Sequence, residues 1–286
     1  MIVDCHVHVY PPEVVADAEK IGRTEEHFAL LASGKVHKWA SIEDVIEGMD
    51  RDGVDQSWIF GFAFKDQGLC SLCNDYVLEG IRRYPERLKG LAVVSPSVRG
   101  AEEEVIRRRE EGFIGVGEIF PQGQNLDLTD IRQTWRLAGA ADEAGMLLLI
   151  HTAEPVGHDY AGKGNVGPRE AAEFCINHPE ARVIFAHFGG GLWLYELMPE
   201  MRLYLSNARY DCAAWPWLYD PAVLAAMETA GVGDKIMYGS DFPILALPRY
   251  EKLLDASWVS DGVREKFLSG NALSFLAGEE SPVNPS

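Results

Sequence analysis

The sequence has 286 residues, of which 47% are hydrophobic, and this is enough to bury one large core without division into separate domains. Its 26 Lys and Arg residues against 44 Asp and Glu residues give a formal net charge of −18, and so negative a surface repels nucleic acid. No apolar run reaches the roughly 20 residues that a membrane helix needs, and Met1 leads directly into a patterned segment without a signal peptide, so we expect a cytoplasmic protein that binds neither nucleic acid nor membrane.

Taken in chain order, apolar or β-branched runs predict strands at 2–9, 56–60, 88–94, 115–120, 146–151, 182–187, 202–206 and 235–240. Amphipathic segments fall between or after them and predict helices at 41–52, 74–84, 101–111, 130–144, 169–177, 221–230, 249–256 and 261–276. The clearest helix begins at Ser41, where Asp44 three residues later completes a capping pattern, and ends at Gly53. This alternation is typical of βα units around a buried parallel sheet.

Eight strands separated by helices favour a closed (β/α)8 TIM barrel over an open doubly wound sheet. We therefore predict a single-domain α/β barrel over residues 1–277, with 278–286 as a flexible tail. The segment 11–34 is longer than an ordinary connection and is predicted to form an inserted helix or lid beside the site. The five cysteines are odd in number and scattered, so we expect reduced thiols, and we interpret Cys70 and Cys73 as the start of a helix.

Histidines and an aspartate stand at the ends of predicted strands, where barrel active sites form. His6 and His8 are two residues apart in the first strand, so both imidazoles face the same side and can chelate a divalent ion. Alone, such a pair is explained equally well by packing within the strand. His151, His187 and Asp241 end or follow strands five, six and eight, and their coincidence with the first pair favours a metal site.

Four segments carry a resemblance to a known family: Asp4-Cys-His-Val-His8, His151-Thr-Ala-Glu154, Phe185-Ala-His-Phe-Gly-Gly190 and Tyr238-Gly-Ser-Asp-Phe-Pro243. In this order they resemble the amidohydrolase superfamily, and more closely its amidohydrolase-related branch of metal-dependent hydrolases and decarboxylases. The resemblance implies a barrel in which His6, His8, His151 and Asp241 bind metal. It also implies that His187 either binds a second metal or acts as a catalytic acid or base beside a single one.

Glu118 bears on the number of metal ions. It ends the predicted fourth strand in Gly117-Glu-Ile-Phe120, where binuclear members of the superfamily place a bridging carboxylate, and the same residues resemble a segment of TatD-like metal-dependent nucleases. A carboxylate can bridge two cations through its two oxygens, whereas a glutamate that is only ion-paired or hydrogen-bonded requires no second ion. Because the decarboxylases of the branch generally use one metal and no bridge, Glu118 favours hydrolysis.

Candidate substrate-binding side chains lie in the loops after the strands. Phe62 follows strand two and Trp193 belongs to a later loop, and each ring would serve either as an apolar wall or as packing between helices and barrel. Arg209, expected after strand seven, is a candidate clamp for a substrate carboxylate, with a structural arginine as the alternative. His158 lies in a glycine-rich loop that we expect to close over the site. We interpret His37 as a surface or local structural residue.

The leading hypothesis is hydrolysis of an amide, lactone or ester bond in a small substrate by metal-activated water, with Asp241 transferring the proton and His187 binding metal or polarising the substrate. The first alternative is a nonoxidative decarboxylase of an aromatic or unsaturated carboxylic acid. A TatD-like nuclease, which the negative charge opposes, and a non-catalytic metal-binding protein are further alternatives. We expect one or two divalent ions, Zn²⁺ first and Mn²⁺, Fe²⁺ or Ni²⁺ otherwise, and leave a homo-oligomer open.

Overall fold

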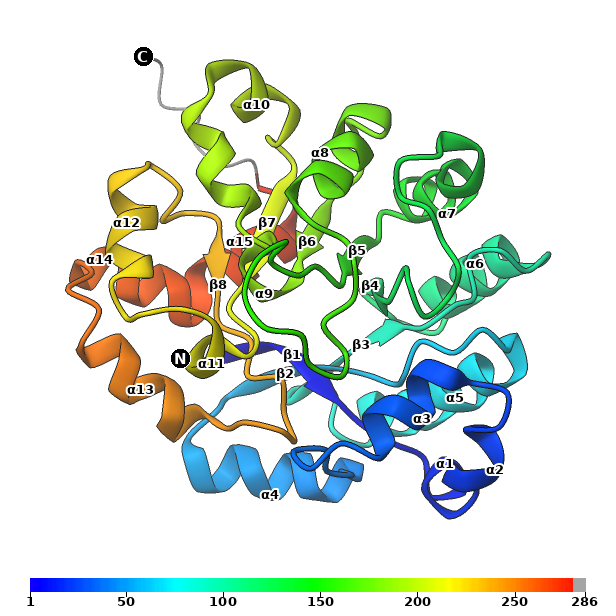
Figure 1. Cartoon of the computed structure of the whole chain (residues 1–286). Helices are drawn as coiled ribbons and strands as arrows, with labels where there is room; N and C mark the ends of the chain where they lie inside the picture. The colour runs from blue at the N-terminus through cyan, green and yellow to red at the C-terminus, as the bar shows by residue number, and fades with distance from the viewer. Residues whose placement is uncertain (280–286) are drawn as a thin grey trace.

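Eight parallel strands form the centre of the structure, a computed structural model that describes residues 1–279. The strands are β1 Val3–His8, β2 Gln56–Phe60, β3 Leu88–Ala92, β4 Gly115–Ile119, β5 Leu147–Ile150, β6 Val183–Phe185, β7 Ala208–Asp211 and β8 Ile236–Met237. Each strand pairs in parallel with the next one along the chain, from β1 to β8. Figure 1 shows these strands surrounded by helices, so the predicted single-domain (β/α)8 TIM barrel is confirmed.

Helices surround the strands and form the outer layer of the barrel (Figure 1). They are α1 Pro12–Ala16, α2 Ala18–Ile21, α3 Glu26–Ala32, α4 Ile42–Asp52, α5 Gln67–Arg83, α6 Ala101–Glu110, α7 Ile131–Glu143, α8 Pro168–Asn177, α9 Ala186–Gly189, α10 Pro199–Tyr204, α11 Trp215–Leu218, α12 Val223–Thr229, α13 Leu247–Asp255, α14 Asp261–Glu265 and α15 Asn271–Ala277. A 3₁₀ turn, η1 Leu192–Leu197, precedes α10, and a π-helical turn, η2 Lys266–Gly270, joins α14 to α15.

The sequence signals at helix ends act as expected in α4. The Ser41 side chain accepts a hydrogen bond from the backbone N–H of Asp44, and the Asp44 side chain accepts one from the backbone N–H of Ser41. Gly53 ends the helix in the left-handed conformation, with φ of 75°, which glycine adopts without steric cost. Helix α5 begins at Gln67, earlier than predicted, so Cys70 and Cys73 lie buried in its first turns.

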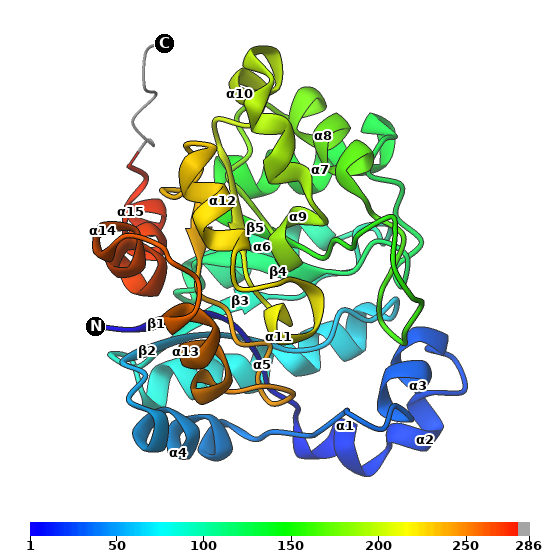
Figure 2. The same ribbon diagram turned by 60° about the vertical axis from the view of Figure 1, so that its left-hand side comes forward.

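The strands bury side chains on both faces. In β5, Leu147 and Leu149 belong to one apolar cluster, whereas Leu148 and Ile150 belong to the larger cluster between strands and helices. This period of two separates the barrel interior from its outer layer. Phe275 of α15 packs on the interior cluster, and Figure 2 shows α15 at the end of the barrel opposite α1 to α3. Helix α15 therefore covers one end, and the carboxyl ends of the strands open at the other.

The barrel closes through the segment that follows the two-residue strand β8. The backbone N–H of Asp241 donates to the carbonyl of His6 at 3.0 Å, and the N–H of His8 donates to the carbonyl of Phe242 at 2.8 Å. These bonds continue the parallel pairing around the ring. As a result, Asp241 lies directly beside the two histidines of β1.

The predicted seventh strand, 202–206, is wrong. These residues lie in α10 and the turn after it, because Pro199 occupies the first turn of a helix, where proline is favoured. The side chain of Leu203 is 71% exposed, so the apolar run does not enter the sheet. The strand is β7, which contains Arg209 and Asp211, both buried. Strand β2 has the predicted ends, the other predicted strands and helices are found with shifted ends, and 261–276 corresponds to α14, η2 and α15.

The predicted insertion after β1 forms α1, α2 and α3. Helix α3 meets the loop after β5, because a Cβ placed on Gly162 would lie 2.6 Å from Leu31 Cδ2, and Figure 2 shows the two segments side by side. Within residues 1–279, no helix has the length and apolar character required to cross a membrane. The predicted tail lies outside the described residues from position 280 onward.

We expect Arg108 of α6 to be a main determinant of stability. It is fully buried, and its guanidinium donates to Glu104 at 2.8 Å, to Asp75 at 2.7 Å and to Glu111 at 2.9 Å. Arg108→Ala leaves a buried carboxylate without its main partner, so the free energy of unfolding should fall by about 3 kcal/mol, measured by urea unfolding. As a control, Arg132→Ala removes the surface pair with Asp130 and should hardly change the urea midpoint of unfolding. Equal losses of stability in the two variants would contradict the role given to Arg108.

Candidate metal centre

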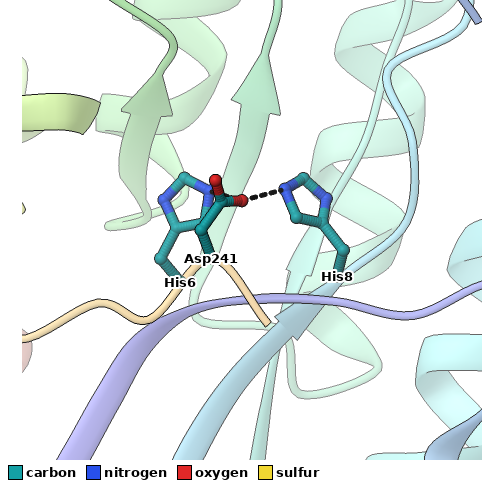
Figure 3. A group of neighbouring side chains, drawn as sticks. All are labelled: His6, His8 and Asp241. Carbon is teal, nitrogen blue, oxygen red and sulfur yellow. Dashed lines mark ion pairs between the residues drawn. The ribbon is translucent and has the colours of Figure 1, made fainter. Parts of the chain in front are cut away.

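The ends of β1 and β8 bring together a first group of candidate metal-binding side chains. His8 Nε2 lies 3.4 Å from Asp241 Oδ1, and His6 Nε2 lies 3.7 Å from the same oxygen. Figure 3 shows the carboxylate between the two imidazoles. Donor atoms of the three residues all lie within 4.8 Å of one another, which is close enough to share one ion.

A second group lies at the ends of β4, β5 and β6. Glu118 Oε1 lies 3.0 Å from His151 Nδ1 and 3.7 Å from His187 Nε2. The other oxygen, Glu118 Oε2, lies 3.8 Å from Nε2 of both His6 and His8. Glu118 therefore stands between the two groups with one carboxylate oxygen toward each.

Each buried imidazole of the two groups is held at the nitrogen that faces away from the site. The pairs are His6 Nδ1 with Asp211 Oδ2 at 2.9 Å, His187 Nδ1 with the Ala213 carbonyl at 3.0 Å, and His151 Nε2 with the Lys163 carbonyl at 3.1 Å. All three partners are oxygen acceptors, so these ring nitrogens carry the protons. The other nitrogens consequently face the site, where they are available as metal donors when deprotonated.

Asp211, at the end of β7, is a site residue that the sequence did not reveal. It is fully buried, and its Oδ2 accepts from His6 Nδ1. Its Oδ1 accepts from the backbone N–H groups of His187 at 3.0 Å and Ala213 at 2.9 Å. One carboxylate thus positions a side chain from β1 and the backbone after β6. Its signal was hidden, because the strand that contains it has no apolar run.

Asp4 supports the seam between β1 and β8 from below. Its Oδ1 accepts from the backbone N–H of His6 at 3.2 Å and of Ser240 at 2.8 Å. Burial raises the pKa of Asp4 to about 7, although these hydrogen bonds act to lower it. A charged residue inside an apolar strand was the available signal for Asp4, since buried acids need partners.

The buried groups of the site shift one another's pKa. Burial disfavours the charged form of His6, but Asp211 and Glu118 outweigh burial and raise the pKa of His6 to about 10. Burial also disfavours ionisation of Asp241, but the hydrogen bond with His8 and the charge of His6 lower the pKa of Asp241 to about 2. Against burial, the charge of His6 likewise lowers the pKa of Glu118 below its usual range. Both carboxylates are therefore ionised at neutral pH, and positive charge is favoured between them.

This arrangement fits a divalent cation. Within residues 1–279, the three carboxylates Asp211, Asp241 and Glu118 form ion pairs only with histidines, although buried carboxylates require positive charge. His6 Nε2 is buried without a hydrogen-bond partner. In the second group, His151 Nδ1 lies 3.2 Å from His187 Nε2 and 3.0 Å from Glu118 Oε1, and a proton or a cation between these atoms would balance the charge of Glu118. Imidazole and carboxylate donors of this kind suit Zn²⁺, Mn²⁺, Fe²⁺ or Ni²⁺.

The candidate donors lie at the floor of a cavity of about 410 Å³, a volume that suits a small molecule. His8, Glu118, His151, His187 and Asp241 line this floor. Apolar and aromatic side chains form the walls: Tyr10, Leu31, Val36, Phe62, Phe120, Trp217 and Ile244. The walls come from the insertion after β1 and from the loops after several strands.

Only some of the predicted substrate-binding residues line the cavity. Phe62 and His158 line the cavity. Trp193 is buried in η1 and is not among the described residues that line it. His37, which was interpreted as a surface or local structural residue, is half-buried and packs against Tyr10 and Trp39, and it also lines the cavity. Only its fold context, the insertion after β1, could have indicated this.

Arg209 does not reach the cavity. It lies within β7, where its Nη1 donates to the carbonyls of Ser206 and Ala208, and its guanidinium stands 4.8 Å from the centre of the Phe275 ring. Phe275 belongs to α15, at the covered end of the barrel. The predicted carboxylate clamp is therefore incorrect, and it failed because the seventh strand was misplaced.

Comparison with known families supports the assignment that the site geometry suggests. A family model described as Amidohydrolase matches residues 3–277. The chain belongs to the amidohydrolase family. The match spans all six candidate metal-binding residues, and it confirms the resemblance seen in the four sequence segments.

Several solved structures share the barrel. A 5-carboxyvanillate decarboxylase from Novosphingobium aromaticivorans, complexed with manganese and a nitrobenzoic acid, is 16% identical, with a TM-score of 0.76 over 97% of this chain and 96% of that one. A dihydroxybenzoic acid decarboxylase from a Polaromonas species, with manganese and 2-nitroresorcinol, is 15% identical, with a TM-score of 0.72 over 96% of each chain. A probable 2-pyrone-4,6-dicarboxylic acid hydrolase from Acinetobacter baumannii, with citric acid, is 16% identical, with a TM-score of 0.60 over 96% and 99%. These identities establish a shared fold alone.

We expect Asp211→Asn to weaken metal binding without unfolding the barrel. The amide oxygen can still accept from the backbone N–H groups of His187 and Ala213, but the amide nitrogen can only donate to His6 Nδ1. The His6 proton then moves to Nε2 and removes the lone pair that faces the site. Affinity for Mn²⁺ or Zn²⁺ should fall about 10- to 100-fold, measured by calorimetry on protein stripped of metal.

Asp4→Asn is the matched control. Asp4 is also buried beneath the site, but it contacts backbone N–H groups and not an imidazole. Because the pKa of Asp4 is raised to about 7, its carboxyl is readily protonated, and the asparagine amide is similar to this neutral form. Metal affinity should therefore change little. Equal losses in the two variants would show that Asp211 does not act through the His6 ring.

Proposed function

We propose that this amidohydrolase family member is a metal-dependent decarboxylase of a small aromatic or unsaturated carboxylic acid. The observation that carries the proposal is the composition of the cavity, whose floor of imidazoles and carboxylates faces walls that include Tyr10, Phe62, Phe120 and Trp217. Such walls suit a planar ring with its acidic group directed at the floor. Two decarboxylases with the same fold contain manganese, which supports decarboxylation over the hydrolysis that Glu118 first suggested, and makes Mn²⁺ the first ion to test.

In this reaction the bond between the substrate carbon and its carboxyl carbon breaks, CO2 leaves, and one proton takes its place. A divalent ion held by the candidate donors would supply positive charge to bind and orient the substrate carboxylate. Asp241 lines the cavity and is assigned to take a proton from a substrate hydroxyl or water and to deliver it to the carbon. His187, whose Nε2 faces the same space, remains a second candidate acid or base. The aromatic walls would exclude water from the reacting carbon.

The Mn²⁺-loaded protein should release CO2 from at least one acid in a panel of hydroxybenzoates that includes 2,6-dihydroxybenzoate and 5-carboxyvanillate. Gas release and the change in ultraviolet absorbance should report one CO2 for each acid consumed. Asp241→Asn, at equal metal content, should lower kcat by at least about 100-fold, because proton transfer typically contributes that much.

The same panel should contain lactones and amides. Turnover of these compounds, with no CO2 from any acid, would contradict decarboxylation. An unchanged kcat in Asp241→Asn would leave decarboxylation in place but remove Asp241 from proton transfer.

Hydrolysis by a binuclear centre is the second candidate, and a specific observation favours it. The two oxygens of Glu118 face different donor groups, at 3.0 Å from His151 Nδ1 and at 3.8 Å from His6 and His8 Nε2. This is the placement of a bridging carboxylate, and two divalent ions so held would supply the charge that activates water. No comparable observation favours the nuclease or the non-catalytic alternative.

Metal content separates the two candidates. For the decarboxylase we expect one equivalent of metal in both wild type and Glu118→Gln, measured by elemental analysis. A bridging role predicts two equivalents in the wild type and one or none in the variant, because an amide offers a single oxygen to the ions. Glu154→Gln changes a nearby acid outside both donor groups and should match the wild type. Two equivalents that fall in Glu118→Gln alone would return hydrolysis to first place.

A further inference from the structure

Basic side chains gather at the mouth of the cavity, although the chain carries a net charge of −18. Lys35 and His37 follow α3, and His158 belongs to the loop after β5; all three line the cavity. Among the described lining residues, the acidic side chains are Glu118 and Asp241, both at the floor. Among the described residues that line it, the mouth therefore offers hydrogen-bond donors and a positive charge but no carboxylate, and the adjacent Asp159 pairs with Lys163 at 3.7 Å.

The two loops that carry these residues are held in place. Besides the close approach of Gly162 to Leu31, Lys163 Nζ donates to the carbonyls of Val156 at 3.1 Å and His158 at 3.2 Å. The carbonyl of Lys163 pairs with the ring of His151 at the floor. The loop with His158 is thus tied both to α3 and to the candidate metal centre, which sets the distance between floor and mouth.

Lys35 and His37 contribute different chemistry. The lysine ion pairs of residues 1–279 involve Lys20, Lys163, Lys235 and Lys266, so the exposed Lys35 ammonium has no carboxylate partner among the described residues and is available to a ligand. Burial, with a contribution from His8, lowers the pKa of His37, so its imidazole is neutral at pH 7 and acts as a hydrogen-bonding group. The His37 ring packs 5.6 Å from Tyr10 and 4.3 Å from Trp39, which fixes its position in the wall.

We propose that Lys35, assisted by His37 and His158, anchors a second anionic group of the substrate at the mouth of the cavity. The substrate class would then be a dicarboxylate, with one carboxylate at the floor, an apolar middle and the other carboxylate at the mouth. This proposal rests on the proposed function only for the carboxylate that lies at the floor. A carboxylate at the mouth gains charge-assisted hydrogen bonds, and a local positive potential on a negative chain draws anions to the opening.

The test is calorimetric binding of benzoate, benzene-1,3-dicarboxylate and benzene-1,4-dicarboxylate to the Mn²⁺-loaded protein. We expect one dicarboxylate to bind more tightly than benzoate, and Lys35→Met to weaken that dicarboxylate about five- to ten-fold while benzoate changes by less than about two-fold. Lys38→Met is the matched control, because it makes the same charge change three residues away on an exposed residue that does not line the cavity. It should leave both affinities near wild type.

The outcomes are distinct. Equal affinities for benzoate and both dicarboxylates, equal losses in Lys35→Met and Lys38→Met, or no binding of any acid would overturn the anchor. Dicarboxylate binding that is lost in Lys35→Met, with no CO2 release from any acid, would support the anchor while the decarboxylase proposal failed. The preference for the dicarboxylate should also shrink as salt rises, since an exposed ammonium is screened.

Discussion

The hydrogen bonds that close the barrel between β1 and the segment after β8 are the constraint on which the site depends. Strand β8 has two residues, so the seam depends on the segment after it, where Asp241 N–H donates to the His6 carbonyl and His8 N–H donates to the Phe242 carbonyl, beside the bond from Cys5 N–H to the Tyr238 carbonyl. The same bonds place a carboxylate from the end of the chain against two histidines from its beginning. The contacts that close the barrel therefore also assemble the first donor group.

The buried carboxylate of Asp211 extends this constraint to the second donor group. His187 has φ of 56°, a left-handed conformation that costs a non-glycine residue roughly 1–2 kcal/mol. Its N–H donates to Asp211, and its Nδ1 pairs with the Ala213 carbonyl, so the surrounding structure offsets that cost. Asp241, at the seam between β1 and the segment after β8, has φ of 61°. Unusual backbone thus occurs where side chains must be directed into the site, as is common at functional positions.

The sequence was most informative where chemistry coincides with strand ends. His6, His8 and Glu118 could be assigned because apolar runs marked their strands and the barrel fold brings those ends together. The failures share a physical cause: Leu203 lies in an apolar run that forms a helix, whereas β7 buries Arg209 without one. Periodicity reports burial only where burial is apolar. The role of Asp211 and the position of Arg209 depend on that strand, and the cavity wall depends on loops whose paths follow from tertiary contacts.

The number of metal ions and the reaction are coupled through charge. With one ion in the group of His6, His8 and Asp241, the negative charge of Glu118 has to be met by a proton on the neighbouring imidazoles. Burial disfavours that proton on His151, but Glu118 outweighs burial and raises the pKa of His151. A protonated imidazole beside the cavity is a source for the proton that Asp241 is assigned to deliver when hydrogen replaces CO2. A second ion would occupy the same nitrogens and displace that proton, leaving a site suited to activate water. Glu118 can serve either state, and the ion count distinguishes them.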